Sequence, residues 1–127
     1  MVVGIVGLGL MGGSFAKVIK KYKLASEVIG YDHNISHQKE AIELDLVQRV
    51  VTLNELKKAD IIVLTIPVDA IIAFNKQLDD LPQTTTVIDF GSTKQMIVEA
   101  LPQALKSHYI PAHPMTGTEK FGPSAAC

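Results

Sequence analysis

The sequence predicts an α/β domain: a doubly wound, mostly parallel sheet between two layers of helices. Apolar stretches of strand length alternate with segments of helical periodicity along the chain. Two of those stretches, residues 2–6 and 60–66, are almost continuously apolar, which is typical of central strands covered on both faces. With 127 residues and 47% hydrophobic content, the chain is long enough for one such domain, which we assign to residues 1–127.

The expected elements follow in order along the chain. Helix 52–58 begins with Thr52-Leu-Asn-Glu55, a capping-box pattern, and helix 67–78 begins with Pro67, which suits the first turn of a helix. Pro102 should kink or shorten the last helix. Right-handed crossovers then give the strand order 3-2-1-4-5-6. Strands are predicted at residues 2–6, 28–31, 48–51, 60–66, 86–90 and 109–112, and helices at 11–23, 36–46, 52–58, 67–78 and 94–105.

Three glycines with the spacing Gly-x-Gly-x-x-Gly connect the first strand to the first helix. Gly7 permits the tight turn, Gly9 leaves room for a pyrophosphate to approach the backbone, and Gly12 lets the helix pack closely on the strand. The helix N-terminus presents N–H groups and its positive dipole end to the phosphates. This pattern indicates a Rossmann-type dinucleotide-binding domain. The candidate cofactor contacts in this loop are Gly7, Leu8, Gly9, Leu10, Met11 and Gly12.

Asp32 is a further candidate cofactor contact, because it lies 20 residues after Gly12 at the end of the second strand. A carboxylate at this place accepts hydrogen bonds from the adenosine ribose hydroxyls. Taken alone, the residue also fits a turn in Asp-His-Asn, but the glycine motif favours the ribose. The carboxylate repels a 2′-phosphate and no arginine follows it, so we expect NAD rather than NADP. Thr65, Ile66, Pro67 and Val68, after the fourth strand, lie at the same edge and complete the expected cofactor contacts.

Two later segments place polar residues at the carboxyl ends of strands. Ser92 either caps the next helix, as Ser92-x-x-Gln95 indicates, or hydrogen-bonds a ligand hydroxyl, and the two roles are compatible. Among the four histidines, only His113 falls in a loop at a strand's carboxyl end, as a general base or as a solvated loop residue. No metal-ligand spacing accompanies it, so we expect no metal, and the chemistry would come from the cofactor.

The composition gives no electrostatic reason to expect nucleic acid or a membrane surface as a partner. The net charge is −1, and the lysines at 17, 20, 21 and 23 end a helix, where cations suit the negative end of the dipole. Cys127 is the only cysteine, and no apolar stretch approaches the roughly 18 residues that span a bilayer. We therefore expect a cytoplasmic protein.

Three segments together resemble the prephenate and arogenate dehydrogenase family. They are Gly7-Leu-Gly-Leu-Met-Gly-Gly-Ser14, Asp89-Phe-Gly-Ser-Thr-Lys94 and His113-Pro-Met-Thr-Gly-Thr-Glu-Lys-Phe-Gly-Pro-Ser-Ala-Ala126. The glycine loop is common to many dehydrogenases, whereas Gly-Ser-x-Lys followed by His-Pro-Met-x-Gly-x-Glu is far more specific. Phe90, Thr93 and Phe121 differ from the residues common in the family, but none of them replaces a polar catalytic group. The resemblance covers the whole chain.

The resemblance implies an NAD-dependent oxidative decarboxylation of prephenate to 4-hydroxyphenylpyruvate, on the route to tyrosine. His113 would accept the proton of the ring hydroxyl, and Ser92 would hydrogen-bond that hydroxyl or the histidine. Thr118 and Glu119 match positions that border the substrate pocket. The family continues into a helical domain that forms the homodimer and supplies an arginine for the substrate carboxylate. We therefore expect an N-terminal fragment that binds NAD weakly and turns over prephenate poorly or not at all.

Three alternatives stay open from the sequence. Arogenate dehydrogenase differs only in accepting an amino in place of a keto side chain. A β-hydroxyacid dehydrogenase of the 6-phosphogluconate type needs a catalytic lysine in a following helical domain, and it leaves the His-Pro-Met segment without a role. A non-catalytic nucleotide-sensing module would keep the three glycines and Asp32 but would not need Ser92 and His113 together.

Overall fold

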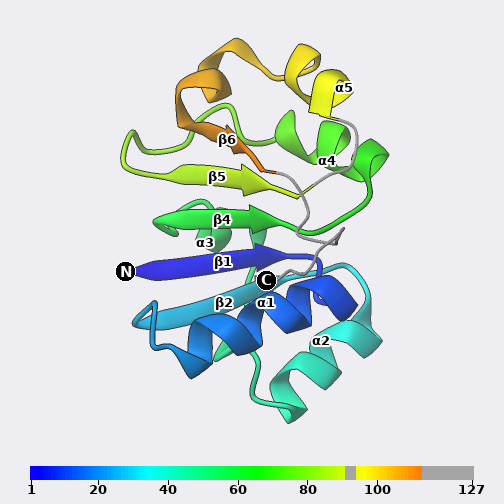
Figure 1. The fold of residues 1–127 in the computed structure, drawn as a ribbon, viewed down its shortest axis with the longest axis vertical. Coiled ribbons are helices and arrows are strands. Elements are labelled where there is room, and N and C mark those ends of the chain that lie inside the picture. The colour runs from blue at the N-terminus through cyan, green and yellow to red at the C-terminus, as the bar shows by residue number, and fades with distance from the viewer. Residues whose placement is uncertain (91–93, 113–127) are drawn as a thin grey trace, which may run out of the picture.

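The computed structural model describes residues 1–90 and 94–112, which form a six-stranded sheet between helices. The strand order is β3-β2-β1-β4-β5-β6, and every neighbouring pair is parallel. All the strands therefore point the same way, with their carboxyl ends at one edge (Figure 1). The predicted order is confirmed. The strands are β1 (Val2–Val6), β2 (Glu27–Tyr31), β3 (Arg49–Val50), β4 (Ile61–Leu64), β5 (Thr86–Asp89) and β6 (Tyr109–Pro111).

The helices lie where the sequence predicts them, with differences at two prolines. Pro67 is the N-cap of its helix and stands just outside the first turn. Pro102 ends the last predicted helix early, because proline has no N–H and clashes with the preceding turn, and a 3₁₀ helix follows it. The helices are α1 (Leu10–Lys21), α2 (Ile35–Glu43), α3 (Leu53–Leu56), α4 (Val68–Asn75), α5 (Lys94–Glu99) and the 3₁₀ helix η1 (Gln103–His108).

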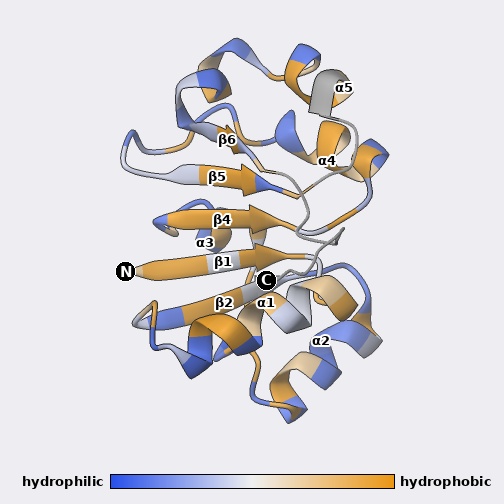
Figure 2. Ribbon diagram, viewed as in Figure 1, coloured by the Kyte–Doolittle hydropathy of each residue, from blue (hydrophilic) through white to orange (hydrophobic). Residues whose placement is uncertain are grey.

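Alternating strand residues fill two separate cores, one on each face of the sheet. In β4, Ile62 and Leu64 pack with α3, α4 and η1, whereas Val63 faces the core that α1 and α2 cover. In β1, Val3 and Ile5 belong to this second core. The central strands are apolar along most of their length (Figure 2). The sheet is thus the middle of three layers, as the sequence predicts. Within the described residues, no helix is long and apolar enough to cross a membrane.

Both α1 and α2 end in a Schellman motif whose left-handed residue is not glycine. After α1, the Leu24 N–H donates to the Ile19 carbonyl (3.0 Å) and the Lys23 N–H donates to the Lys20 carbonyl (3.2 Å). Lys23 has a φ of 53°, and Asp45, at the equivalent position after α2, has a φ of 56°. Side chains other than glycine are strained in this region, so each helix end carries a local cost.

This geometry makes Lys23→Gly a stabilising substitution. Glycine removes the strain of the left-handed conformation, and the structure gives the Lys23 side chain no ion-pair partner among the described residues. We expect the free energy of unfolding to rise by about 1 kcal/mol, and Tm by about 4 °C, measured by thermal melts followed by circular dichroism. Lys17→Gly is the matched control: it lies on the exposed face inside α1 and should lower stability by about 0.5–1 kcal/mol. Equal effects of the two changes would contradict the strain at Lys23.

Candidate functional site at the carboxyl edge of the sheet

The glycine loop between β1 and α1 is fixed by the strands on both sides of β1. The Gly7 N–H donates to the Tyr31 carbonyl at the end of β2 (2.9 Å). From β4, the Thr65 hydroxyl lies 2.8 Å from the carbonyl oxygens of both Val6 and Gly7 and donates to them. Gly7 itself has a φ of 92°, which favours glycine and produces the turn that the sequence predicts.

Gly12 and Gly9 differ sharply in the space around them. A Cβ atom on Gly12 would lie 1.8 Å from the Gly7 carbonyl oxygen, so α1 packs against the loop in a way that only glycine allows. A Cβ atom on Gly9 would meet only the Cε1 atom of His37, at 3.6 Å. Gly9 is also the N-cap of α1 and offers no side-chain oxygen to the first N–H groups of that helix. The backbone at Gly9 is thus open to an incoming group, at the positive end of a helix dipole.

Asp32, directly after β2, holds the glycine loop through its carboxylate. The Leu8 N–H donates to Asp32 Oδ2 (2.7 Å), and the Asn34 N–H donates to Oδ1 (2.8 Å). The His37 Nδ1 atom, from the first turn of α2, lies 3.0 Å from Oδ2. The Asp32 side chain remains 14% exposed, so a ligand can still contact it although these hydrogen bonds hold it in place.

These hydrogen bonds keep Asp32 ionised. Partial burial alone would raise the pKa of its carboxyl, but hydrogen bonds from the Asn34 N–H, the Leu8 N–H and His37 outweigh burial and lower the pKa below its usual value. The stabilisation that these hydrogen bonds give to the fold is therefore fully present at pH values above the ordinary pKa of an aspartate. It is lost as the pH falls through the lowered pKa of Asp32. Asp32 is a carboxylate, and only an acceptor, at neutral pH.

A pocket of about 270 Å³ opens beside Asp32, between the end of β2 and α4. Its walls are mainly apolar, with polar groups at the rim, which is typical of small-ligand sites. Among the predicted contacts, Gly7, Asp32 and Ile66 line it, while Leu8 is 4% exposed and Leu10 91% exposed. The lining residues are Val6, Gly7, Tyr31, Asp32, His33, Ile66, Ala70, Ala73, Phe74 and Gln77.

Comparisons with known proteins identify the family of the chain. Residues 15–127 match the family model of the prephenate dehydrogenase nucleotide-binding domain. The chain belongs to this family. It is 36% identical to the prephenate dehydrogenase of Lactococcus lactis subsp. cremoris over 131 aligned residues, which cover 96% of the chain and 36% of that protein. This match favours the prephenate dehydrogenase family over the β-hydroxyacid dehydrogenases.

Two solved structures of the family are similar in fold. The first is prephenate dehydrogenase from Aquifex aeolicus in complex with hydroxyphenyl propionate and NAD⁺, with a TM-score of 0.84 and 32% identity. The second is arogenate dehydrogenase from Synechocystis, with a TM-score of 0.78 and 33% identity. The matches cover 94% and 93% of this chain but only 43% and 42% of those chains. The chain thus spans less than half the length of the relatives it matches.

The residues expected to contact the substrate in this family lie outside the described residues. They are Ser92, His113, Thr118 and Glu119. Described residues that precede them in the sequence are Asp89–Phe90 and Ala112, whose backbone N–H donates to the Asp89 carbonyl (2.9 Å). The ends of β5 and β6 therefore lie side by side, and the segments that carry Ser92 and His113 leave the sheet from neighbouring strands. In the described part of the chain, no three His, Cys, Asp or Glu side chains are grouped to hold a metal ion.

Sequence reasoning missed two polar groups, one at this edge and one buried in the core. One is His37, whose contact with Asp32 depends on how α2 leaves β2, and no motif marks it. The other is a buried polar cluster in which the Asn75 amide donates to the Tyr109 hydroxyl (3.1 Å), close to the fully buried Asp89. Burial raises the pKa of the Tyr109 hydroxyl and the Asp89 carboxylate raises it further, although the hydrogen bond with Asn75 opposes the shift. This cluster joins the last residue of α4 to the first residue of β6, close to the last residue of β5.

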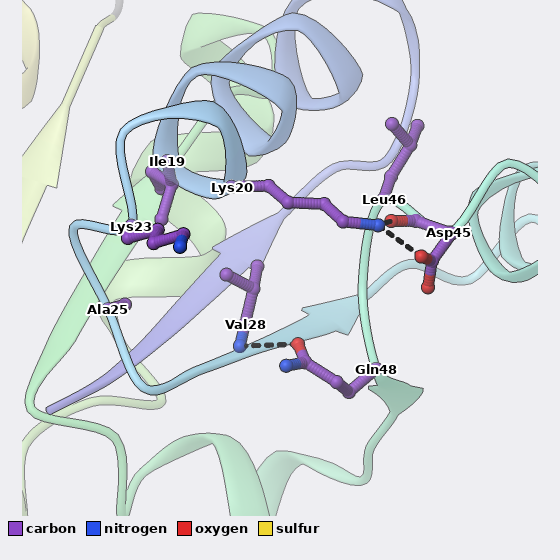
Figure 3. Close-up of a pocket in the computed structure, with 8 residues that line it drawn as sticks. All are labelled: Ile19, Lys20, Lys23, Ala25, Val28, Asp45, Leu46 and Gln48. Atoms are coloured by element: carbon purple, nitrogen blue, oxygen red, sulfur yellow. Dashed lines mark hydrogen bonds and ion pairs between the residues drawn. The ribbon is translucent and has the colours of Figure 1, made fainter.

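A second hollow, of about 330 Å³, lies at the opposite edge of the sheet (Figure 3). Helices α1 and α2 end there, so both present the negative ends of their dipoles. The Lys20 ammonium donates to the Asp45 carbonyl (2.9 Å) and is ion-paired with the Asp45 carboxylate, which satisfies the cation preference of the α2 end. The hollow is lined by Ile19, Lys20, Lys23, Ala25, Val28, Asp45, Leu46 and Gln48.

The contrast between Gly12 and Gly9 gives a testable pair of substitutions. Gly12→Ala forces a methyl group against backbone that cannot move aside, so we expect the free energy of unfolding to fall by about 3 kcal/mol in urea titrations. Gly9→Ala meets only ordinary contact with His37 and should change stability by less than about 1 kcal/mol. A Gly12→Ala protein as stable as the wild type would contradict the close packing of α1 on the loop.

Proposed function

We propose that this chain binds NAD at the carboxyl edge of its sheet and serves, as residues 1–127, as the dinucleotide-binding domain of an NAD-dependent prephenate dehydrogenase. The observation that carries the proposal is the joint geometry of Asp32 and Gly9. The ionised Asp32 carboxylate accepts from the Leu8 N–H in the glycine loop, and the next residue, Gly9, has open backbone at the N-terminus of α1. Bound NAD would supply the acceptor for the hydride that leaves the substrate.

The residues of the edge fit the parts of this cofactor. Gly9 and the first N–H groups of α1 suit a pyrophosphate, because, among the described residues, only the Cε1 atom of His37 lies near the ideal Cβ position of Gly9. Asp32 suits a ribose hydroxyl, which is a donor. The apolar pocket beside Asp32 suits a flat ring such as adenine. Thr65, Ile66, Pro67 and Val68 follow β4 between the glycine loop and β5, where they would border the cofactor on its way to the substrate side.

The relatives support both the cofactor and the substrate class. The Aquifex aeolicus structure contains NAD⁺ and hydroxyphenyl propionate, an aromatic acid with the same ring and chain length as 4-hydroxyphenylpyruvate. By this proposal, His113 accepts the proton of the substrate hydroxyl, Ser92 hydrogen-bonds that hydroxyl or the histidine, and Thr118 and Glu119 border the ring. Arogenate is a second candidate substrate, favoured by the 33% identity to the Synechocystis arogenate dehydrogenase.

The full reaction, in this proposal, needs the additional length that the relatives have. That length would supply the group that binds the substrate carboxylate and the contacts of a homodimer. The product would enter tyrosine synthesis, and a cytoplasmic location belongs to the same proposal, because the reaction draws on the cellular pool of NAD. The 127-residue chain alone should then bind the cofactor but convert prephenate poorly.

The cofactor part of the proposal is tested by Gly9→Ala. A methyl group at this position would occupy the space where the proposal places the pyrophosphate. We therefore expect the Kd for NAD⁺ to rise about tenfold or more, which is a loss of about 1.4 kcal/mol of binding free energy. Isothermal titration calorimetry measures the Kd, and a urea titration verifies that stability is unchanged. Thr86→Ala, at the start of β5 and at the other edge of the sheet, is the control that should leave the Kd unaltered. Unchanged NAD⁺ affinity in folded Gly9→Ala protein would refute the assignment of the glycine loop.

The catalytic part is tested by His113→Asn in the longer protein that carries this domain. Loss of a positioned general base should lower kcat by about 10²–10⁴-fold while the affinity for NAD⁺ stays the same. The rate is followed by NADH absorbance with prephenate as substrate. A nucleotide-sensing module would show no turnover in the wild type, and an unchanged kcat would remove His113 from the mechanism.

A further inference from the structure

The capacity of Asp32 to accept hydrogen bonds is nearly filled within the chain. An ionised carboxylate has about four acceptor positions, two on each oxygen. The Leu8 N–H and His37 Nδ1 occupy Oδ2, and the Asn34 N–H occupies one position on Oδ1. About one position, on Oδ1, is left for a ribose that carries two hydroxyls. The second hydroxyl, or whatever replaces it, must find a partner other than Asp32.

His37 is the side chain best placed to be that partner. Because Asp32 is ionised and cannot donate, the hydrogen between the two groups belongs to Nδ1 of His37. Nε2 of a neutral imidazole is then an acceptor. The backbone N–H of His37 donates to the side-chain Oδ1 atom of Asn34 (3.1 Å), and this hydrogen bond fixes His37 at the start of α2. Its Cε1 atom faces Gly9 at 3.6 Å from the ideal Cβ position, and the side chain is 42% exposed.

We propose that His37 determines which adenosine ribose the site accepts. Neutral His37 offers Nε2 as an acceptor for a ribose 2′-hydroxyl, which favours NAD. Protonated His37 offers an N–H⁺ donor, which binds a 2′-phosphate and offsets the repulsion from Asp32. The inference rests on the proposed cofactor site, and it predicts that NADP becomes a better ligand relative to NAD as pH falls.

Other titratable and charged groups lie near His37, and the comparison with His37→Gln isolates its contribution because those groups are unchanged in the variant. Asp32 faces it from the end of β2, and its lowered pKa keeps it ionised between pH 5.5 and 8. Lys17 from α1 and Glu40 from α2, which carry opposite charges, line a hollow of about 250 Å³ together with His37. His33 lies against the Tyr31 ring, with 5.4 Å between the ring centroids, and lines the adenine-sized pocket. The 2′-phosphate itself titrates near pH 6, so the experiment must separate its contribution from that of His37.

The test compares the Kd values for NAD⁺ and NADP⁺ at pH 8 and pH 5.5 by isothermal titration calorimetry on the 127-residue chain. Between pH 8 and pH 5.5, the ratio of the NADP⁺ Kd to the NAD⁺ Kd should fall in both proteins, and the factor of the fall should be about ten times larger in the wild type than in His37→Gln. Glutamine keeps a hydrogen-bond donor but cannot take up a charge. His37→Lys carries a permanent cation and should show a low ratio at both pH values. His108→Gln, whose ring lies 2.8 Å from the Thr85 carbonyl at the far edge, should behave as the wild type.

The outcomes separate this inference from the proposed function. If NAD⁺ binds and the ratio changes equally in the wild type and His37→Gln, only the phosphate titrates and the role of His37 is overturned. A high ratio in folded His37→Lys at both pH values overturns it as well. If NAD⁺ fails to bind at either pH, the proposed cofactor site falls, and this inference falls with it.

Discussion

The hydrogen bond from the Leu8 N–H to Asp32 joins the glycine loop to the end of β2, and the rest of the edge depends on it. Leu8 is buried because its side chain lies over Gly30, where a Cβ atom would come within 2.8 Å of the Leu8 Cδ1 atom. The hydrogen bond of its N–H is partly buried, so this donor needs an acceptor inside the chain. Asp32 supplies that acceptor, so a buried leucine, a strand glycine and a carboxylate form one unit.

The same loop is held from the other side by Thr65 of the β4 end. Its hydroxyl donates to the carbonyls that precede the turn, while the Thr65 N–H donates to Val6 (2.9 Å) and continues the β1–β4 ladder. The conformation that exposes the Gly9 backbone is therefore set before any ligand arrives. Preorganisation of this kind lowers the entropy cost of binding, because the strands on both sides hold the glycine loop in one conformation.

The sequence predicted the sheet order and the loop because both depend on local patterns. The apolar runs of β1 and β4 mark the central strands, and the glycine spacing marks the turn and the packing of α1. Other features depend on how separate elements meet. The approach of His37 to Asp32, the pairing of Lys20 with Asp45 and the contact between Asn75 and Tyr109 join residues whose spacing carries no signal. Pro102 was recognised as a helix breaker, but the 3₁₀ turn after it was not.

The two edges of the sheet show why a phosphate-bearing ligand suits one and not the other. In a parallel sheet with helical crossovers, every helix starts near the carboxyl ends of the strands and finishes near their amino ends. Helix α1 therefore brings its positive end to Gly9 and its negative end, with that of α2, to the hollow of Figure 3. Neither helix therefore offers the positive end of its dipole to an anion in that hollow. Under the proposed function, the ribose would lie at the end of β2 beside α2, whereas Ser92 and His113 follow β5 and β6 in the sequence, so cofactor choice and substrate chemistry would depend on different strands.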